Sequence, residues 1–155
     1  MNCFTRAIAS PAGDGQKVMA FGPHLIRITA QDTGGAMGVL EATVPAGEGP
    51  PLHLHEREEE FFRVLSGRFA FWCADEMAVL EEGGCIALPR GIPHRFQNIG
   101  DKDGRLMVVV TPGGFEQFFP EIERRQPSGP EELVAIAAEF GLTFLSSGQA
   151  NQAAA

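Results

Sequence analysis

The sequence contains few of the residues that mark several common classes of protein. Its 155 residues include no tyrosine, one tryptophan, four histidines and three cysteines. The cysteines are odd in number and show no Cys-x-x-Cys spacing, so a reducing cytoplasm suits them better than a disulfide framework. The longest apolar runs, 69–74 and 106–110, are too short to cross a bilayer. The first six residues contain no apolar segment of the secretory type.

Basic residues are also scarce. Twelve lysines and arginines stand against twenty acidic residues, which gives a formal net charge of −8. A field of that sign repels phosphate backbones and anionic lipid, so nucleic acid and membrane surfaces are not expected partners. Length and composition predict one soluble, cytoplasmic domain over residues 1–145, followed by a flexible tail over 146–155.

Glycine and proline are plentiful, at 19 and 11 residues, and they separate short apolar segments. Residues 24–30 alternate between two faces, as expected of a half-buried strand. Segments of this kind recur every 8–12 residues or so through a core of about 17–111, which predicts an antiparallel sandwich or barrel. The further predicted strands are 36–44, 60–66, 68–73, 77–80, 85–88, 94–98 and 106–111.

The periodicity changes after residue 114. Apolar residues then follow helical spacing, which predicts a helical segment over about 115–141. Pro120 is expected to kink or restart the first helix. Ser128 and Glu131 have the spacing of a capping box, and Gly141 is a plausible C-cap.

Three of the four histidines fall within two short segments. His53 and His55 alternate on one strand and therefore project from the same face. Glu60 follows on the returning strand, and His94 lies on a later strand. If these strands face one another inside a barrel, three imidazoles and a carboxylate converge. Such a nitrogen and oxygen donor set suits a divalent transition-metal ion.

These two segments resemble the paired motifs of the cupin family. The first reads Gly, five residues, His-x-His, four residues, Glu, six residues and Gly over 47–67. The second reads Gly, five residues, Pro-x-Gly, two residues, His, three residues and Asn over 83–98. Both match without a gap, and the chain as a whole resembles small single-domain bacterial cupins of the quercetin-dioxygenase-like type. The resemblance implies an all-β, double-stranded β-helix (jelly-roll) barrel with a short C-terminal helical segment.

The resemblance also implies a ligand set. Matched residue by residue, the metal ligands are His53, His55, Glu60 and His94, and Glu60 could also act as a catalytic base. Glu59 is the rival carboxylate, but only Glu60 leaves six residues before Gly67. The ion is Fe, Mn, Ni, Co or Zn, because this donor set accepts most of the divalent series.

Apolar residues on the same strand faces are expected to line a substrate pocket. They are Phe62, Val64, Phe71, Phe96 and Met107. A pocket of this composition suits an apolar or aromatic small molecule, and the lack of tyrosine leaves it without a phenol for proton transfer. The same residues could instead simply fill the barrel core.

The function expected from the resemblance is a metal-dependent oxygenase or dioxygenase acting on an enol or phenol. The alternatives are a non-redox isomerase, cyclase or lyase, and a non-catalytic small-molecule-binding cupin. The resemblance further implies a homodimer, with 17–21 as a candidate pairing strand.

The remaining polar and sulfur-containing residues have less specific interpretations. His24 is expected at a surface or rim, and the turn 56–58 is expected to be solvated. Strand parity directs Arg90 and Arg95 away from the His94 face. Cys73 and Cys85 are interpreted as small core residues.

Overall fold

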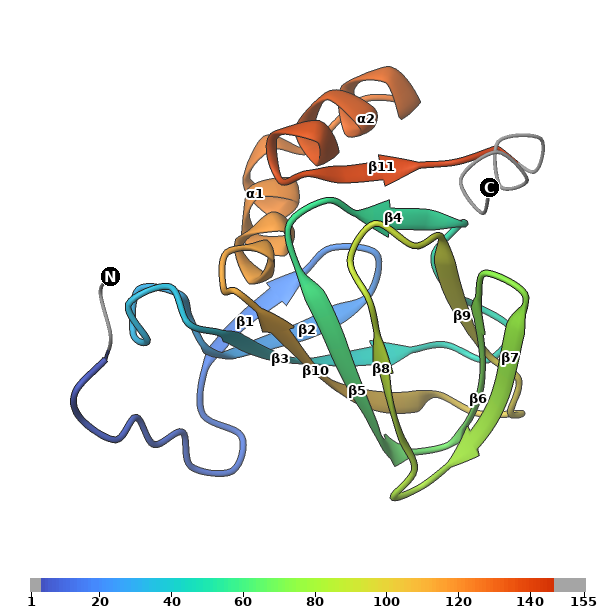
Figure 1. Ribbon diagram of the computed structural model, residues 1–155, viewed down its shortest axis with the longest axis horizontal. Helices are drawn as coiled ribbons and strands as arrows, with labels where there is room; N and C mark the ends of the chain where they lie inside the picture. The colour runs from blue at the N-terminus through green and yellow to red at the C-terminus, as the bar shows by residue number, and fades with distance from the viewer. Residues whose placement is uncertain (1–3, 147–155) are drawn as a thin grey trace.

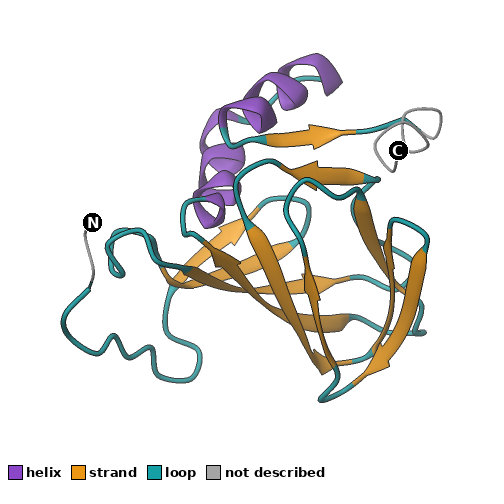
Figure 2. Ribbon diagram, viewed as in Figure 1, coloured by secondary structure: helices purple, strands orange, loops and turns teal. Residues whose placement is uncertain are grey.

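Strands and turns make up most of the chain from Gln16 to Thr111 in the computed structural model, which describes residues 4–146 (Figure 1). The strands are β1 (Gln16–Met19), β2 (Pro23–Ile28), β3 (Gly38–Val44), β4 (His53–His55), β5 (Glu59–Ser66), β6 (Arg68–Cys73), β7 (Glu76–Glu81), β8 (Cys85–Leu88), β9 (His94–Asn98) and β10 (Gly104–Thr111). They are followed by a 3₁₀ turn η1 (Phe115–Gln117), the helices α1 (Phe118–Arg125) and α2 (Pro130–Glu139), and a last strand β11 (Leu142–Phe144). Figure 2 shows both helices gathered at one end of the barrel.

The strands form two sheets in which every pairing is antiparallel. One has the order β1-β2-β3-β10-β5-β8, and the other has the order β11-β4-β9-β6-β7. Strands β3 to β10 pair in a nested way, β3 with β10, β4 with β9, β5 with β8 and β6 with β7. This nesting folds one long hairpin into a double-stranded β-helix. The predicted all-β jelly-roll barrel is therefore confirmed.

Period-two alternation decides which residues fill the barrel. In β10, Leu106, Val108 and Val110 are buried, and the residues between them are more exposed. Met107 pairs with Glu41 and lies on the outer parity, so its assignment to an inner pocket is wrong. The strand is apolar on both faces, so its composition does not mark which face is outside.

The predicted helical segment divides into η1, α1 and α2. Pro120 is the third residue of α1, where a backbone N–H has no intrahelical acceptor, and η1 gives way to α1 just before it, so the helix restarts near Pro120 as one of the two expected outcomes. The predicted capping box of Ser128 and Glu131 is wrong, because the N-cap of α2 is Gly129 and no side chain caps the helix. Glu132 Oε2 accepts from Ser128 N at 2.9 Å and from Ser128 Oγ at 3.0 Å. Gly141 follows α2 with φ of +68°, as expected of a C-terminal cap.

Strand β11 lies beyond the predicted helical segment and was not predicted. It pairs antiparallel with β4, with Leu142 opposite His55 and Phe144 opposite His53. Of the predicted tail, only Ser146 lies within the described residues. Neither helix in residues 4–146 has the length and apolar character needed to span a bilayer.

Candidate metal centre

Three strands bring the predicted ligands into one cluster. His53 and His55 lie on the inner face of β4, with exposed fractions of 6% and 1%. His53 is the register partner of His94 on β9, and Glu60 enters from β5 on the opposing sheet. One donor atom from each of the four residues can be chosen so that all lie within 4.8 Å of one another.

The two candidate carboxylates face opposite sides of β5. Glu60 is buried, whereas Glu59 is directed outward and held by Arg90, with Nε to Oε1 at 2.5 Å and Nη2 to Oε2 at 2.6 Å. This ion pair lowers the pKa of Glu59. The structure therefore places Glu60 in the cluster and Glu59 outside it.

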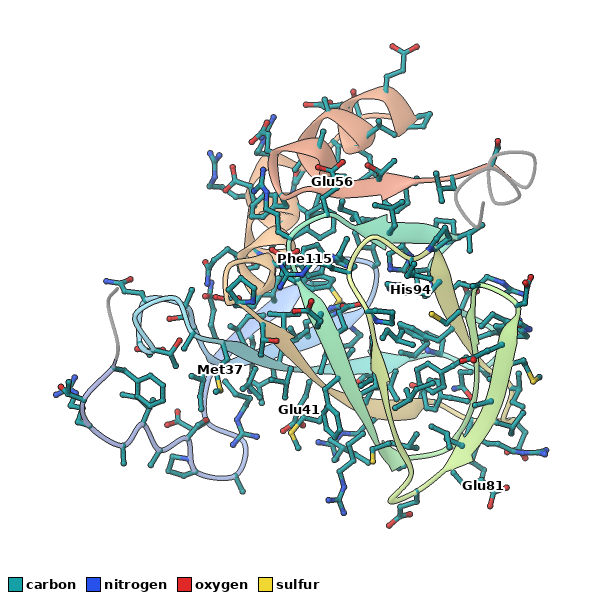
Figure 3. The ribbon with its side chains drawn as sticks, viewed as in Figure 1. Met37, Glu41, Glu56, Glu81, His94 and Phe115 are labelled. Atoms are coloured by element: carbon teal, nitrogen blue, oxygen red, sulfur yellow. The ribbon has the colours of Figure 1, made fainter. Side chains whose placement is uncertain are left out.

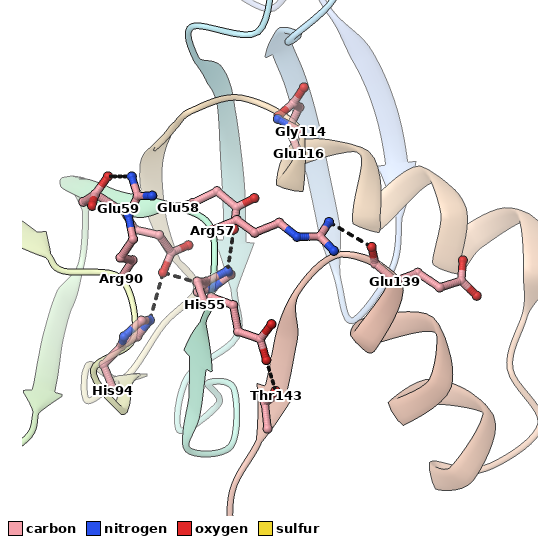
Figure 4. A network of polar contacts seen from close by, with 12 residues as sticks. His55, Arg57, Glu58, Glu59, Arg90, His94, Gly114, Glu116, Glu139 and Thr143 are labelled. Carbon is pink, nitrogen blue, oxygen red and sulfur yellow. Dashed lines mark hydrogen bonds and ion pairs between the residues drawn. The ribbon is translucent and has the colours of Figure 1, made fainter. Parts of the chain in front are cut away.

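The spacing within the cluster fits a shared ion. Glu60 Oε2 lies 2.9 Å from His94 Nε2 and 3.3 Å from His55 Nε2. Figure 4 shows His55 and His94 within this network of polar contacts. Donors bound to a common transition-metal ion at about 2.0–2.2 Å stand roughly 3 Å apart. Three imidazoles and one carboxylate are also the donor types that such ions accept. The residues present therefore fit a divalent transition metal.

Backbone carbonyls orient two of the imidazoles. His53 Nδ1 lies 2.8 Å from the carbonyl oxygen of Pro51, and His94 Nδ1 lies 2.9 Å from that of Ile92. A carbonyl oxygen only accepts, so each Nδ1 carries a proton, and Nε2 is the ring nitrogen left to face an ion.

The electrostatic environment of the cluster favours the protonation states that a bound cation requires. Burial and the neighbouring His94 lower the pKa of His53 to about 4, although Glu60 opposes the shift. Burial disfavours ionisation of Glu60, but the surrounding histidines outweigh it, and the pKa of Glu60 is lowered. At neutral pH the cluster thus presents a neutral His53 and a carboxylate, as cation binding requires.

An aromatic layer lies next to the ligands inside the barrel. Phe62 follows Glu60 by two residues on β5, and Phe96 follows His94 by two on β9, so both share their ligand's strand face. Phe71 completes the layer, with ring centroids 5.4 Å from Phe62 and 5.8 Å from Phe96. Val64, two residues after Phe62 on β5, is also buried. Four of the five predicted pocket residues therefore face the interior, where the three rings pack against one another.

Phe115 of η1 packs on the histidine cluster from the helical end of the molecule. Its ring meets His55 edge-on, with centroids 4.3 Å apart. Figure 3 shows Phe115 and His94 at the barrel end nearest the helices. The next residue, Glu116, is fully buried and accepts from Ala30 N at 2.6 Å and Gly114 N at 2.7 Å. Glu116 therefore anchors the turn that holds Phe115 against His55.

Gly38→Ala is expected to disturb this anchor. A methyl group on Gly38 would overlap the Glu116 carboxylate. Overpacking of this kind costs about 1–3 kcal/mol, so the free energy of unfolding in urea should fall by that amount. Gly129→Ala adds the same methyl group where no atom lies within 4 Å and should cost less. Equal stability losses in the two variants would contradict the assignment of Glu116 as an anchor.

The other singled-out residues lie outside the cluster. His24 stacks on Phe119 with centroids 4.0 Å apart, and Arg95 lies over Trp72 at 3.8 Å. Cys85 is exposed, so its interpretation as a core residue is wrong. Cys73 is partly buried as the register partner of His94, and Cys3 lies outside the described residues.

The turn 56–58 is only partly solvated. Glu58 is 4% exposed, whereas Glu56 and Arg57 are exposed as expected. The expectation for Glu58 is therefore wrong. Alternating charge in a turn does not reveal which side chain is directed inward.

Comparisons with known proteins centre on the same region. A model of the cupin domain matches residues 40–110. Protein SchB of Streptomyces halstedii is 38% identical over 84 residues, which cover 54% of this chain and 59% of SchB. A quercetin 2,3-dioxygenase of Aspergillus japonicus is 30% identical over 99 residues, which cover 59% of this chain but only 28% of that enzyme.

Solved structures agree on the fold. KdgF from Halomonas sp. superposes with a TM-score of 0.63 over 72% of this chain and 99% of its own, at 14% sequence identity. The residues matched by the domain model include all four members of the histidine and glutamate cluster. With this fold and these relatives, the chain belongs to the cupin superfamily.

Proposed function

We propose that this protein is a metal-dependent oxygenase, of the dioxygenase type, acting on an apolar or aromatic enol or phenol. The observation that carries the proposal is the buried set of His53, His55, Glu60 and His94 directly beside an aromatic layer. The similarity to quercetin 2,3-dioxygenases supports the redox form of the reaction.

The proposed mechanism divides the work between the cluster and the aromatic layer. The bound ion supplies Lewis-acid polarisation and a template for the reacting oxygens. Glu60 Oε2 lies among the imidazole nitrogens and is ionised at neutral pH, so it is placed to accept the hydroxyl proton of an enol or phenol. The phenylalanine rings exclude water from the side of the cluster that faces the barrel interior.

Metal analysis and oxygen consumption together test the proposal. Purified protein should hold a divalent transition metal, and the His53→Ala/His94→Ala double variant should lose it. Protein loaded with Fe or Mn should consume oxygen with some members of a panel of phenols and enols. Turnover without oxygen uptake would favour the isomerase, cyclase or lyase alternative. Ligand-induced stabilisation without turnover would favour a binding protein, and failure to take up any of Fe, Mn, Ni, Co or Zn would overturn the site.

We also propose a cytoplasmic homodimer that binds a small molecule. Strand β1 is an edge strand, and Met19 at its end and Phe21 just beyond it are each 62% exposed. Met19 N–H is already bonded to Glu123 Oε1 at 2.8 Å, so side-chain packing suits this contact better than continuous strand pairing.

Phe21→Asp should shift the dimer to monomer in sedimentation equilibrium. Phe21 has a φ of +56°, which aspartate tolerates better than most residues. Met77→Asp alters a side chain of similar exposure, 57%, on β7 and should leave the dimer intact. A monomeric wild-type protein would contradict the proposal.

A further inference from the structure

The three imidazoles of the cluster are not oriented in the same way. His53 and His94 each place Nδ1 within 2.9 Å of a backbone carbonyl oxygen. His55 Nδ1 is buried and, within residues 4–146, has no hydrogen-bond partner. The polar atom that it faces is Glu58 Oε2, 3.6 Å away, which is equally without a hydrogen bond in that part of the chain.

The position of Glu58 is unusual for a turn residue. Its side chain is 5% exposed, between the exposed Arg57 and the outward-facing Glu59. A buried carboxylate without hydrogen bonds is costly, and a buried N–H without an acceptor is costly as well. The gap of 3.6 Å exceeds an ordinary N–H···O distance of about 2.7–3.2 Å by little. A small rotation of either side chain would satisfy both groups.

We propose that Glu58 is a positioning residue of the metal site. Its carboxylate accepts a hydrogen bond from the Nδ1–H of His55 and so directs the Nε2 lone pair of His55 to the ion. This inference rests on the proposed function. Glu58 would provide His55 with an acceptor for its Nδ1–H, as the carbonyl oxygens of Pro51 and Ile92 do for His53 and His94. A carboxylate acceptor behind a ligating imidazole fixes both its tautomer and its ring orientation.

Charge balance supports the same role. A divalent ion held by three neutral imidazoles and Glu60 alone would leave one positive charge in a buried site. Glu58 adds a second carboxylate within a few ångströms, so the two carboxylates together neutralise the ion. Buried charges persist in proteins when they are compensated in this way. Arg90 is already bonded to Glu59, which leaves Glu58 directed toward His55.

Zn²⁺ affinity and the tautomer of His55 test the proposal on the full chain. Chelator competition measures Zn²⁺ binding, and ¹⁵N NMR of the apo protein reports which ring nitrogen of His55 carries the proton. Glu58→Ala should weaken Zn²⁺ binding by about 10–100-fold and reduce the population of the Nδ1–H form of His55. The tautomers of His53 and His94 should not change. Glu56→Ala removes an exposed carboxylate of the same turn and should change neither measurement.

Glu58→Gln distinguishes the effect of the hydrogen bond to His55 from the effect of the negative charge of Glu58. Its amide oxygen still accepts from Nδ1, so the tautomer should be retained, with a loss of Zn²⁺ affinity smaller than that of Glu58→Ala. If Glu58→Ala does not fold, Glu58→Gln decides: affinity below that of Glu56→Ala supports the role, and equal affinity overturns it. Wild-type affinity in Glu58→Ala with an unchanged His55 tautomer also overturns it. Failure of the wild type to bind Zn²⁺ or any other ion would remove the proposed function, and the apo tautomers would still decide whether Glu58 orients His55.

Discussion

Glu60→Gln should weaken binding of a divalent transition metal by at least about 100-fold, whereas Glu59→Gln should leave it within about twofold. Removing a group behind a ligand already costs about 10–100-fold in affinity, and Glu60 is the only carboxylate in the cluster of four. A neutral amide keeps the volume of Glu60 and can still contact His55 and His94, so the barrel should fold. The measurement is chelator competition with Co²⁺ or Zn²⁺, with thermal denaturation of the apo protein as the check on folding.

The two variants form a matched pair because each removes one negative charge from adjacent positions of β5. Glu59 faces outward and pairs with Arg90, so its loss removes only an exposed ion pair, which contributes little. A large loss of affinity in Glu59→Gln with a small one in Glu60→Gln would assign the opposite carboxylate to the metal. Wild-type affinity in both variants would show that neither carboxylate binds the ion.

Strands of the barrel are predictable from the sequence where turn residues bound them on both sides. The predicted segments 68–73, 85–88 and 94–98 coincide with β6, β8 and β9. Glycines around them adopt conformations that other residues rarely reach, such as Gly67 with φ of +93° and Gly83 with φ of +88°. Turn glycines of this kind can be recognised in a single sequence, because their conformation depends on the residue itself and not on distant contacts.

The four cluster residues could be assigned because motif spacing and strand parity agree. His53 and His55 share a face by alternation, and the distance to Gly67 selects Glu60 over Glu59. Strand alternation could not show whether Met107 faces inward or outward, because residues 106–110 are all apolar. Pairing of β10 with β3 and β5 decides which of its residues face inward, and this pairing cannot be derived from the sequence of β10 alone.

Glu58 and β11 escaped prediction for a common reason, because both depend on contacts between distant segments. The turn that carries Glu58 is attached to the C-terminal segment: Arg57 Nη1 donates to Glu139 O at 3.0 Å, and Glu56 N donates to Gly141 O at 2.9 Å. Strand β11 is only three residues long, too short for a recognisable alternation. The scaffold of the cluster thus extends well beyond the two motifs.

Thr143→Pro should therefore weaken both the fold and the metal site. Glu56 N bonds to Gly141 O and Leu145 N to Leu52 O, so the alternation of an antiparallel ladder places Thr143 and Leu54 in the hydrogen-bonded pair between them. Proline has no N–H to donate there, and β4 would lose its outer neighbour beside both histidines. We expect a loss of about 3 kcal/mol in the free energy of unfolding, as for proline in a regular element, and about tenfold weaker Zn²⁺ binding.

Thr143→Val is the matched control, because it keeps the backbone N–H and the β-branched shape. It removes only the contact of Thr143 Oγ1 with Glu56 Oε1, which is 3.4 Å long and exposed. Urea denaturation and chelator competition should therefore give nearly wild-type values for this variant. If Thr143→Pro lowers stability but binds Zn²⁺ as tightly as Thr143→Val, then pairing with β9 alone holds His53 and His55 in place. A parallel loss of both properties would establish that the C-terminal strand, far from either motif, holds the His-x-His strand in its ligand-presenting position.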